Sequence, residues 1–393
     1  MKSSMLKNLL LTGLLIIGCA GFSLSPEELF NKGRSCFKEK NYAEAVEYFR
    51  QAAEQGHAGA QNGLGVCYAR GNGVKKDSAE AVKYFRKAAE RGFAKAQFHL
   101  GWCYANGNGV EKDQAEALKW FRKAAEQGYA QAQCNLGWCY ATGEGVPKNP
   151  EQAVLWFRKA AEQGFAPAQC SLGFCYEKGE GVPRDMKKAV YWFRKAAEQG
   201  FTVAQYSLGK CYEHGDGVEP DAAEAVKWFR KAAEQGFAPA QNNLGVCYAD
   251  GKGVEPDDAE AVKWYRKAAE QGLKEAQSNL GQCYRNGEGV PKDMKKAVYW
   301  FRKAAEQGFA PAQDNLGGCY ANGKGVEPDD AEAAKWYRKA AEQGFAPAQF
   351  NLSRCYFNGE GVPRDLKKMA YWCRKAAEQG HEKAQEALKK LGQ

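Results

Sequence analysis

Residues that bind metals are scarce and scattered in this 393-residue sequence. Its four histidines, His57, His99, His214 and His381, lie far apart along the chain. Its fourteen cysteines include no Cys-x-x-Cys pair. Because a structural zinc site needs such ligands at close spacing, we expect neither a metal nor any other cofactor.

The start of the sequence lacks a hydrophobic run long enough to cross a bilayer. Its apolar stretch, residues 9–17, is about half of the ~20 residues that a membrane-spanning helix needs. Lys2 and Lys7 precede this stretch, and small residues with one cysteine follow at 18–20. This order is typical of an export signal, so we predict a signal peptide over residues 1–20.

Two kinds of processing fit this signal. The residues Ile16-Ile17-Gly18-Cys19 resemble the bacterial lipoprotein signal, in which the cysteine becomes the lipidated first residue of the mature protein. Cleavage near Ala20 or Phe22 would instead release the chain. We favour lipidation of Cys19, because a small residue precedes it and because it lies outside the repeat described below. We therefore expect a lipoprotein of the periplasm or outer membrane, or alternatively a secreted protein.

The chain has no long track of unpaired basic side chains. Its formal net charge of +9 is modest, and much of the basic content is a recurring Arg-Lys pair such as Arg86-Lys87, followed by an acidic residue such as Glu90. Residues three or four positions apart lie on one helix face, so we predict ion pairs there. A nucleic-acid groove needs basic charges left free, and we expect no nucleic-acid partner.

Sustained alternation of apolar and polar residues, the signal of a strand, is also absent. A 36-residue period is present instead, in which a Leu-Gly-x-Cys-Tyr block, a Gly-x-Gly-Val turn and an aromatic-Arg-Lys-Ala-Ala-Glu block follow one another. Nine cysteines mark this period: Cys67, Cys103, Cys139, Cys175, Cys211, Cys247, Cys283, Cys319 and Cys355. A fixed period of this length predicts a solenoid whose units bury their apolar faces against their neighbours.

Each unit has the pattern of two antiparallel helices. In the unit of Cys103, apolar residues at helical spacing predict a first helix over residues 94–105, and the Gly107-Asn108-Gly109 turn ends it. Asp113 and Glu116 predict a capping box at the start of a second helix, which stops at Gly128. The same capping pattern recurs as Asp77 with Glu80, Asn149 with Gln152, Asp221 with Glu224, Asp257 with Glu260 and Asp329 with Glu332. The expected fold is an all-α, α/α solenoid.

Disulfides between the repeated cysteines are not expected. Equivalent residues of neighbouring units lie roughly 8–10 Å apart, whereas a disulfide needs Cα atoms within about 7 Å. We interpret these cysteines as small buried apolar residues. Cys355 and Cys373, on the two helices of one unit, remain a possible pair.

The spacing Ala-x-x-x-Leu-Gly-x-x-Tyr-x-x-Gly-x-Gly-Val, followed by Asp, an aromatic residue and Lys-Ala-Ala, resembles the Sel1-like repeat, a relative of the tetratricopeptide repeat. The resemblance covers nine units, residues 57–380. Residues 26–56 are closer to a tetratricopeptide repeat with a loop four residues shorter, and we interpret them as an N-terminal cap repeat. Residues 381–393 are predicted to form a C-terminal capping helix.

The resemblance implies one activity to be weighed, because cysteine-rich Sel1-like proteins are associated with β-lactam binding or hydrolysis. Two Ser-x-x-Lys matches occur, Ser35 with Lys38 and Ser207 with Lys210, but neither Ser-Asp-Asn nor Lys-Thr-Gly accompanies them. Ala88-Ala89 and Gln97 stand where those relatives carry paired cysteines. The Gly-x-Gly-Val turn follows a helix and lacks the third glycine of a dinucleotide site. We predict no catalytic residues and no enzyme, with a β-lactam activity as the alternative.

The residues that vary between units predict a binding surface. They lie three before, one after and four after the signature glycine, and such spacing places them on one helix face. In tetratricopeptide-like stacks this face lines the concave groove. We predict that the groove binds a protein or an extended peptide through Phe98, Trp102, Trp138, Phe174, Tyr206, Lys210, Gln282, Arg285 and Arg354. The recurring tryptophans of the second helices, Trp120 and its equivalents, are instead predicted to be core.

We therefore predict a non-catalytic adaptor of the bacterial cell envelope that presents a groove to a protein or peptide. It would contact the membrane only through a lipid on Cys19. A secreted effector that binds host proteins is a further alternative.

Overall fold

The computed structural model of the chain describes residues 24–390, which contain twenty-one α-helices and no strand. The prediction of an all-α repeat fold is confirmed. The described residues form two compact units that divide between Arg184 and Asp185, and each is described by itself below. The predicted signal peptide and Cys19 lie outside the described residues. None of the helices in residues 24–390 is long and apolar enough to cross a membrane.

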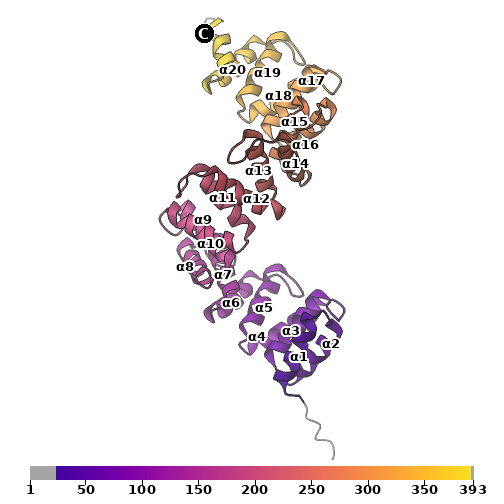
Figure 1. Cartoon of the computed structure of the whole chain (residues 1–393), viewed down its shortest axis with the longest axis vertical. Coiled ribbons are helices and arrows are strands. Elements are labelled where there is room, and N and C mark those ends of the chain that lie inside the picture. The colour runs from indigo at the N-terminus through magenta and orange to yellow at the C-terminus, as the bar shows by residue number, and fades with distance from the viewer. Residues whose placement is uncertain (1–23, 391–393) are drawn as a thin grey trace, which may run out of the picture. The chain divides into compact units, whose positions relative to one another are not determined.

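The first unit contains nine helices, coloured indigo to magenta in Figure 1. They are α1 (Pro26–Lys38), α2 (Tyr42–Glu54), α3 (Ala58–Arg70), α4 (Ser78–Glu90), α5 (Ala94–Asn106), α6 (Gln114–Glu126), α7 (Ala130–Thr142), α8 (Pro150–Glu162) and α9 (Ala166–Lys178). We call the odd-numbered helices A helices and the even-numbered ones B helices. The loop between α1 and α2 is short, residues 39–41, whereas residues 71–77 join α3 to α4.

The second unit contains the remaining twelve helices. They are α10 (Met186–Glu198), α11 (Thr202–His214), α12 (Ala222–Glu234), α13 (Ala238–Asp250), α14 (Asp258–Glu270), α15 (Lys274–Asn286), α16 (Met294–Glu306), α17 (Ala310–Ala321), α18 (Asp330–Glu342), α19 (Ala346–Asn358), α20 (Leu366–Glu378) and α21 (Glu382–Lys390). Helix α21 packs against α20 at the end of this stack.

Within each unit, an A helix packs against the B helix of its own repeat, and that B helix packs against the next A helix. The core between them is built from one leucine of the A helix and one aromatic ring of the B helix, as for Leu136 and Phe157, both almost fully buried. The signature glycine lets these helices approach closely, since a Cβ on Gly137 would lie 2.6 Å from the Phe157 ring. The repeated glycine is therefore a packing residue.

The Gly-x-Gly turn ends the A helix in the way the sequence predicts. Gly107 and Gly109 adopt positive φ angles of 71° and 75°, which a residue with a Cβ rarely does. A glycine is required at position 109 for a second reason. A Cβ there would lie 2.1 Å from the carbonyl oxygen of Ser78 in the preceding repeat.

The predicted capping boxes form only in half. The Asp113 carboxylate accepts hydrogen bonds from the backbone N–H groups of Ala115 and Glu116, but Glu116 pairs with Lys119 at 2.8 Å instead of returning to the cap. The same Glu-Lys pair forms at Glu80, Glu224, Glu260 and Glu332. A lysine three residues ahead offers the carboxylate a charged partner, so the return bond of the box is not made.

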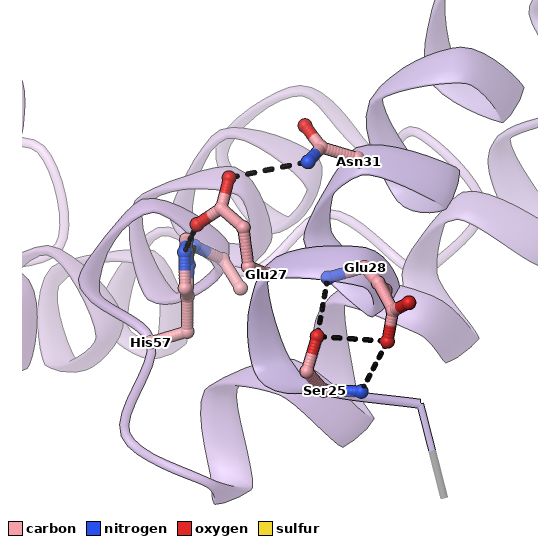
Figure 2. Close-up of polar contacts among 6 residues, drawn as sticks. Ser25, Glu27, Glu28, Asn31 and His57 are labelled. Carbon is pink, nitrogen blue, oxygen red and sulfur yellow. Dashed lines mark hydrogen bonds and ion pairs between the residues drawn. The ribbon is translucent and has the colours of Figure 1, made fainter. Parts of the chain in front are cut away.

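A complete capping box stands where it was not predicted, at the start of α1. Glu28 accepts from the Ser25 backbone N–H at 2.8 Å, and Ser25 Oγ accepts from the Glu28 N–H at 3.2 Å. Figure 2 shows this box beside a contact of 2.9 Å between Glu27 and His57. His57 in turn caps α3, because its Nδ1 accepts from the Ala60 N–H. Together these contacts fix the first two A helices to one another.

The recurring Arg-Lys pair has different partners from those predicted. The predicted ion pair with the following glutamate is present among the described residues at Lys375 and Glu378, which lie 3.8 Å apart. The arginine instead donates to the hydroxyl of a tyrosine in the next A helix at 2.7–3.1 Å; these pairs are Arg86–Tyr104, Arg122–Tyr140, Arg158–Tyr176, Arg194–Tyr212, Arg230–Tyr248, Arg266–Tyr284, Arg302–Tyr320 and Arg338–Tyr356. The basic residues therefore join neighbouring repeats.

The lysine of the same pair lies over a tryptophan ring of its own B helix. Lys123, for example, lies 4.4 Å from the Trp120 ring centre, close enough for a cation–π interaction. The prediction that these tryptophans are core is confirmed for Trp120, Trp228 and Trp336, which are buried. It is wrong in part for the other five, which are half-buried: Trp156, Trp192, Trp264, Trp300 and Trp372. An overlying lysine does not explain the difference, because it is present over the buried Trp228 and Trp336 and over the half-buried Trp156 and Trp264 alike.

A ladder of glutamine side chains runs where cysteine-rich relatives would carry disulfides. Gln97 donates to the Ala89 carbonyl oxygen at 3.1 Å and accepts from Gln127 of the next B helix at 2.7 Å. The same Gln-Gln bond recurs in both units. Cys355 and Cys373, the pair left open by the sequence, are free thiols and both are buried. Burial raises the pKa of the Cys103 thiol to about 11, which makes it a poor nucleophile at neutral pH.

Candidate functional site

The predicted binding residues occupy three positions of the repeat. Those directly after the signature position differ in exposure, and Trp102 and Trp138 are 48% and 50% exposed. Arg354 is also exposed, whereas Phe174, Lys210 and Gln282 are half-buried. Phe98, Trp102, Trp138 and Phe174 belong to the first unit; Tyr206, Lys210, Gln282, Arg285 and Arg354 belong to the second.

Residues three before the signature position are less free than predicted. Phe98 is half-buried and makes an edge contact with Tyr129, at 5.5 Å between ring centres. Tyr206 contacts Phe237 in the same way at 5.3 Å. Tyr129 and Phe237 are the N-cap residues of the next A helices, and they close over this position. Phe98 and Tyr206 thus also pack between repeats, and the prediction that they contact a partner in the groove stays a prediction.

Arg285, four after the signature position, is also held by its neighbours. Its guanidinium donates to Asn315 Oδ1 at 2.7 Å and lies 5.7 Å from the Phe301 ring centre. This arginine stabilises the seam between α15 and α17, and only part of it remains for a partner.

A cleft of about 400 Å³ opens in the first unit between α3, α4 and α5. We call it the N-terminal cleft. Its walls are mainly apolar and include Val66, Phe85, Phe98 and Trp102. Its volume falls within the range of about 300–1,000 Å³ that is usual for ligand pockets. Two predicted residues, Phe98 and Trp102, thus line one cavity.

Val66 lines the N-terminal cleft from α3. Its equivalent two repeats later is Trp138, which packs edge-on against Phe157 with 5.6 Å between ring centres. The equivalent of Phe157 in the cleft is Phe85, which is buried although it lines the cavity. The His99 ring packs against Phe85, with 4.9 Å between ring centres.

The rim of the N-terminal cleft carries residues that sequence reasoning missed. Arg70, at the end of α3, and Lys76, in the following loop, both line it, together with Ser78 and Asn108. His99 lines it from α5, and its Nδ1 lies 2.8 Å from Asn62 Oδ1. Since an amide oxygen only accepts, His99 donates from Nδ1 and its Nε2 carries a lone pair. Burial, with Lys95 and Arg70 nearby, lowers the pKa of His99 to about 4, so the ring is neutral at pH 7.

The depressed pKa of His99 predicts a loss of stability in acid. In the unfolded chain, His99 takes up a proton below its ordinary pKa of 6.5, whereas in the folded protein it stays neutral down to about pH 4. The free energy of unfolding therefore falls between these two pH values, by about 2 kcal/mol. In His99→Asn this loss should disappear, while the bond to Asn62 is kept, as Asn279 keeps one to Asn242. Urea unfolding at pH 7 and pH 4.5 measures the difference. The same change at exposed His214 should leave the acid-induced loss as large as in the wild type.

The second unit contains a cleft at the equivalent place, seven repeats later, between α17, α18 and α19. This C-terminal cleft has a volume of about 230 Å³ and is lined by Asp330, Tyr337, Asn351, Arg354 and Glu360. Gly318 stands at the repeat position that Val66 occupies in the first unit. Tyr337 replaces Phe85 and Arg354 replaces Trp102, so the walls here are polar and charged.

The serine of one Ser-x-x-Lys match has an acidic partner. Ser35 is exposed on α1 and donates its hydroxyl to Glu39 Oε1 at 3.0 Å. The described residues also contain no cluster of three metal-ligating side chains. The features with the form of binding sites are the exposed A-helix residues, the two clefts and a further pocket of about 400 Å³ in the second unit, lined by Phe350, Arg354, His381 and Lys383 among others.

Comparison with known proteins gives the family. The Sel1 repeat model matches ten consecutive segments: residues 22–57, 58–93, 94–129, 130–165, 166–201, 202–237, 238–273, 274–309, 310–345 and 346–381. The chain is a Sel1 repeat protein. The Sel1 match includes residues 22–57, the segment interpreted above as closer to a tetratricopeptide repeat.

Two solved Sel1 structures resemble this chain. The first is c5321, a protective antigen present in uropathogenic Escherichia coli strains, with 36% identity and a TM-score of 0.63 over 97% of this chain and 88% of that chain. The second is a Sel1 repeat protein from Oxalobacter formigenes, with 37% identity and a TM-score of 0.60 over 79% of this chain and 89% of that chain. No curated protein matches this Sel1 sequence significantly. Sel1 repeats form scaffolds that typically mediate protein–protein interactions.

Proposed function

We propose that this Sel1 repeat protein is an exported, non-catalytic scaffold that binds a protein or an extended peptide through the A helices of its first unit. The observation that carries the proposal is the exposure of two tryptophans, Trp102 and Trp138, at the same position of successive A helices. Large aromatic rings are costly to leave in water, and clusters of them usually mark interaction surfaces. Tryptophan is also among the residues that contribute most to binding energy at interfaces.

The N-terminal cleft supports the same surface. It lies directly beside Trp102, which forms one of its walls. A partner could therefore lie across the exposed rings and insert one side chain into the cavity. Neither the hydrolase alternative nor a nucleic-acid partner has a comparable feature, because Ser35 bonds Glu39 and the recurring arginines donate to tyrosines.

Replacement of Trp102 and Trp138 by alanine should remove most of the partner binding. Both side chains are about half exposed, so their truncation should leave helicity unchanged while it deletes the contact surface. We expect at least a tenfold drop in protein captured from cell-envelope extracts, read by quantitative mass spectrometry. The matched control replaces Tyr299 and Tyr371, which are 51% and 52% exposed on B helices, and should capture as the wild type does. Undiminished capture by the tryptophan variant would show that the proposed surface is wrong.

Export remains a proposal of its own, carried by the order of residues at positions 1–20. The related E. coli protein is described as a protective antigen, which supports a location outside the cytoplasm. Labelling of growing cells with a radioactive fatty acid should mark the wild type and leave Cys19→Ser unlabelled. Release of unlabelled wild-type protein into the medium would instead favour the secreted effector.

A further inference from the structure

We propose that the N-terminal cleft recognises one bulky apolar side chain within an acidic peptide segment. This inference rests on the proposed function and names the chemistry of the ligand. The apolar side chain would enter the cavity between α3 and α5, and carboxylates beside it would lie against the basic rim.

The walls of the cleft select for an apolar group. The buried ring of Phe85, the side chains of Val66 and Ala69 and the ring of Trp102 line the cavity. Burial of a Phe or Leu side chain is worth about 1.5–3 kcal/mol, whereas a charged group would lose its water there. His99 does not alter this preference, because its pKa of about 4 keeps it neutral.

The rim selects for negative charge. Arg70 and Lys76 both line the cleft, and neither forms an ion pair or a side-chain hydrogen bond among the residues 24–390 that the structure describes. None of the residues that line this cleft is acidic. These two basic side chains create a positive electrostatic potential beside the apolar cavity, and a ligand that carries carboxylates would complement it.

The C-terminal cleft shows how the same place in the repeat can have another preference. There Asp330 and Glu360 stand where Ser78 and Asn108 stand in the N-terminal cleft. Arg354 replaces Trp102, and Tyr337 places a hydroxyl where Phe85 has only ring carbon. An acidic peptide would meet two carboxylates there, so the proposed ligand should bind the first cleft and not the second. The chain thus contains its own comparison site.

The chain also supplies a substitution that fills the cleft with little strain. Trp102 and Trp138 occupy the position of Val66 in the next two repeats, so Val66→Trp copies an arrangement that the fold already accepts. The matched control is Val246→Trp, the same change at the same repeat position in the second unit. Circular dichroism and thermal unfolding of both variants should match those of the wild type.

The probe is a fluorescein-labelled synthetic peptide, Gly-Glu-Asp-Phe-Glu-Asp-Gly, titrated with full-length protein and read by fluorescence anisotropy. Val66→Trp should weaken its binding at least thirtyfold, and Val246→Trp should not change it. Exchange of the peptide's phenylalanine for alanine should weaken binding as much as Val66→Trp does. Arg70→Asn with Lys76→Gln should weaken binding about tenfold at 50 mM salt and reduce its salt dependence, since exposed charges are screened as salt rises.

The outcomes separate this inference from the proposed function. If a peptide with lysines in place of the acidic residues binds as well, or if Val66→Trp binds the acidic peptide as the wild type does, the inference is wrong. Loss of envelope-protein capture in the Trp102/Trp138 variant would still uphold the scaffold in that case. If the acidic peptide binds only when the C-terminal cleft is intact, as tested with Gly318→Trp, the assignment to the first unit is overturned.

Discussion

Replacement of Gly317 by alanine is expected to destabilise the second unit by about 1–2 kcal/mol. A Cβ at this position would lie 2.8 Å from the ring of Tyr337, which is buried. Overpacking of this kind costs about 1–3 kcal/mol, and the better helix propensity of alanine returns about 1 kcal/mol at most. Urea unfolding, together with hydrogen exchange in α17 and α18, measures the loss where it arises.

The neighbouring glycine provides the control for this change. A Cβ on Gly318 would find the Tyr337 hydroxyl at 3.7 Å and no closer atom. Gly318→Ala should therefore stabilise α17 by about 0.5–1 kcal/mol, the ordinary gain for a helix interior. Two adjacent glycines in one helix should thus respond with opposite sign. Equal destabilisation by both changes would mean that the close contact with Tyr337 is not what requires the glycine.

Much of the fold could be predicted because the same local sequence signals recur in repeat after repeat. The glycine turns, the N-cap of each B helix and the leucine core follow from residues within one helix pair, as Gly107, Asp113 and Leu100 illustrate. The contacts that join one repeat to the next were harder to predict. Arg86 has a glutamate four residues ahead of it in the sequence, but it donates to Tyr104, because the stack brings that hydroxyl beside the B helix.

The candidate site could be predicted only in part, because contacts between repeats decide which of the variable residues are exposed. Variation between repeats identified Trp102 and Trp138, and their exposure agrees with a surface role. It could not separate them from Phe98, which lies on the same helix face but is covered by Tyr129 of the next repeat. The clefts were missed because each is lined by residues of three helices from two successive repeats. Variation along one helix face does not show how such residues come together.

The last full repeat differs from the others at the contact between the signature residue of the A helix and the B-helix residue opposite it. Ser353 stands at the signature position, and Cys373 stands where the other B helices carry Phe or Tyr. Both are buried. At eight signature glycines, Gly33, Gly65, Gly101, Gly137, Gly209, Gly245, Gly281 and Gly317, a Cβ would lie only 2.5–2.8 Å from the ring opposite. The serine is therefore tolerated because the ring is gone, and each residue of the pair compensates for the other.

Cys373→Phe alone should consequently destabilise the C-terminal end of the chain by about 2–3 kcal/mol, since the new ring would meet the Cβ of Ser353. Ser353→Gly alone should cost about 1–2 kcal/mol, because it opens a small void and adds a glycine to α19. The double variant restores the pairing of Gly317 with Tyr337 and should regain most of the stability, which gives a coupling energy of about 2 kcal/mol in a double-mutant cycle. Urea unfolding with hydrogen exchange in α19 and α20 measures the cycle. Additive losses in the double variant would contradict the view that one steric contact, between the signature residue and the ring opposite, sets the spacing of every helix pair.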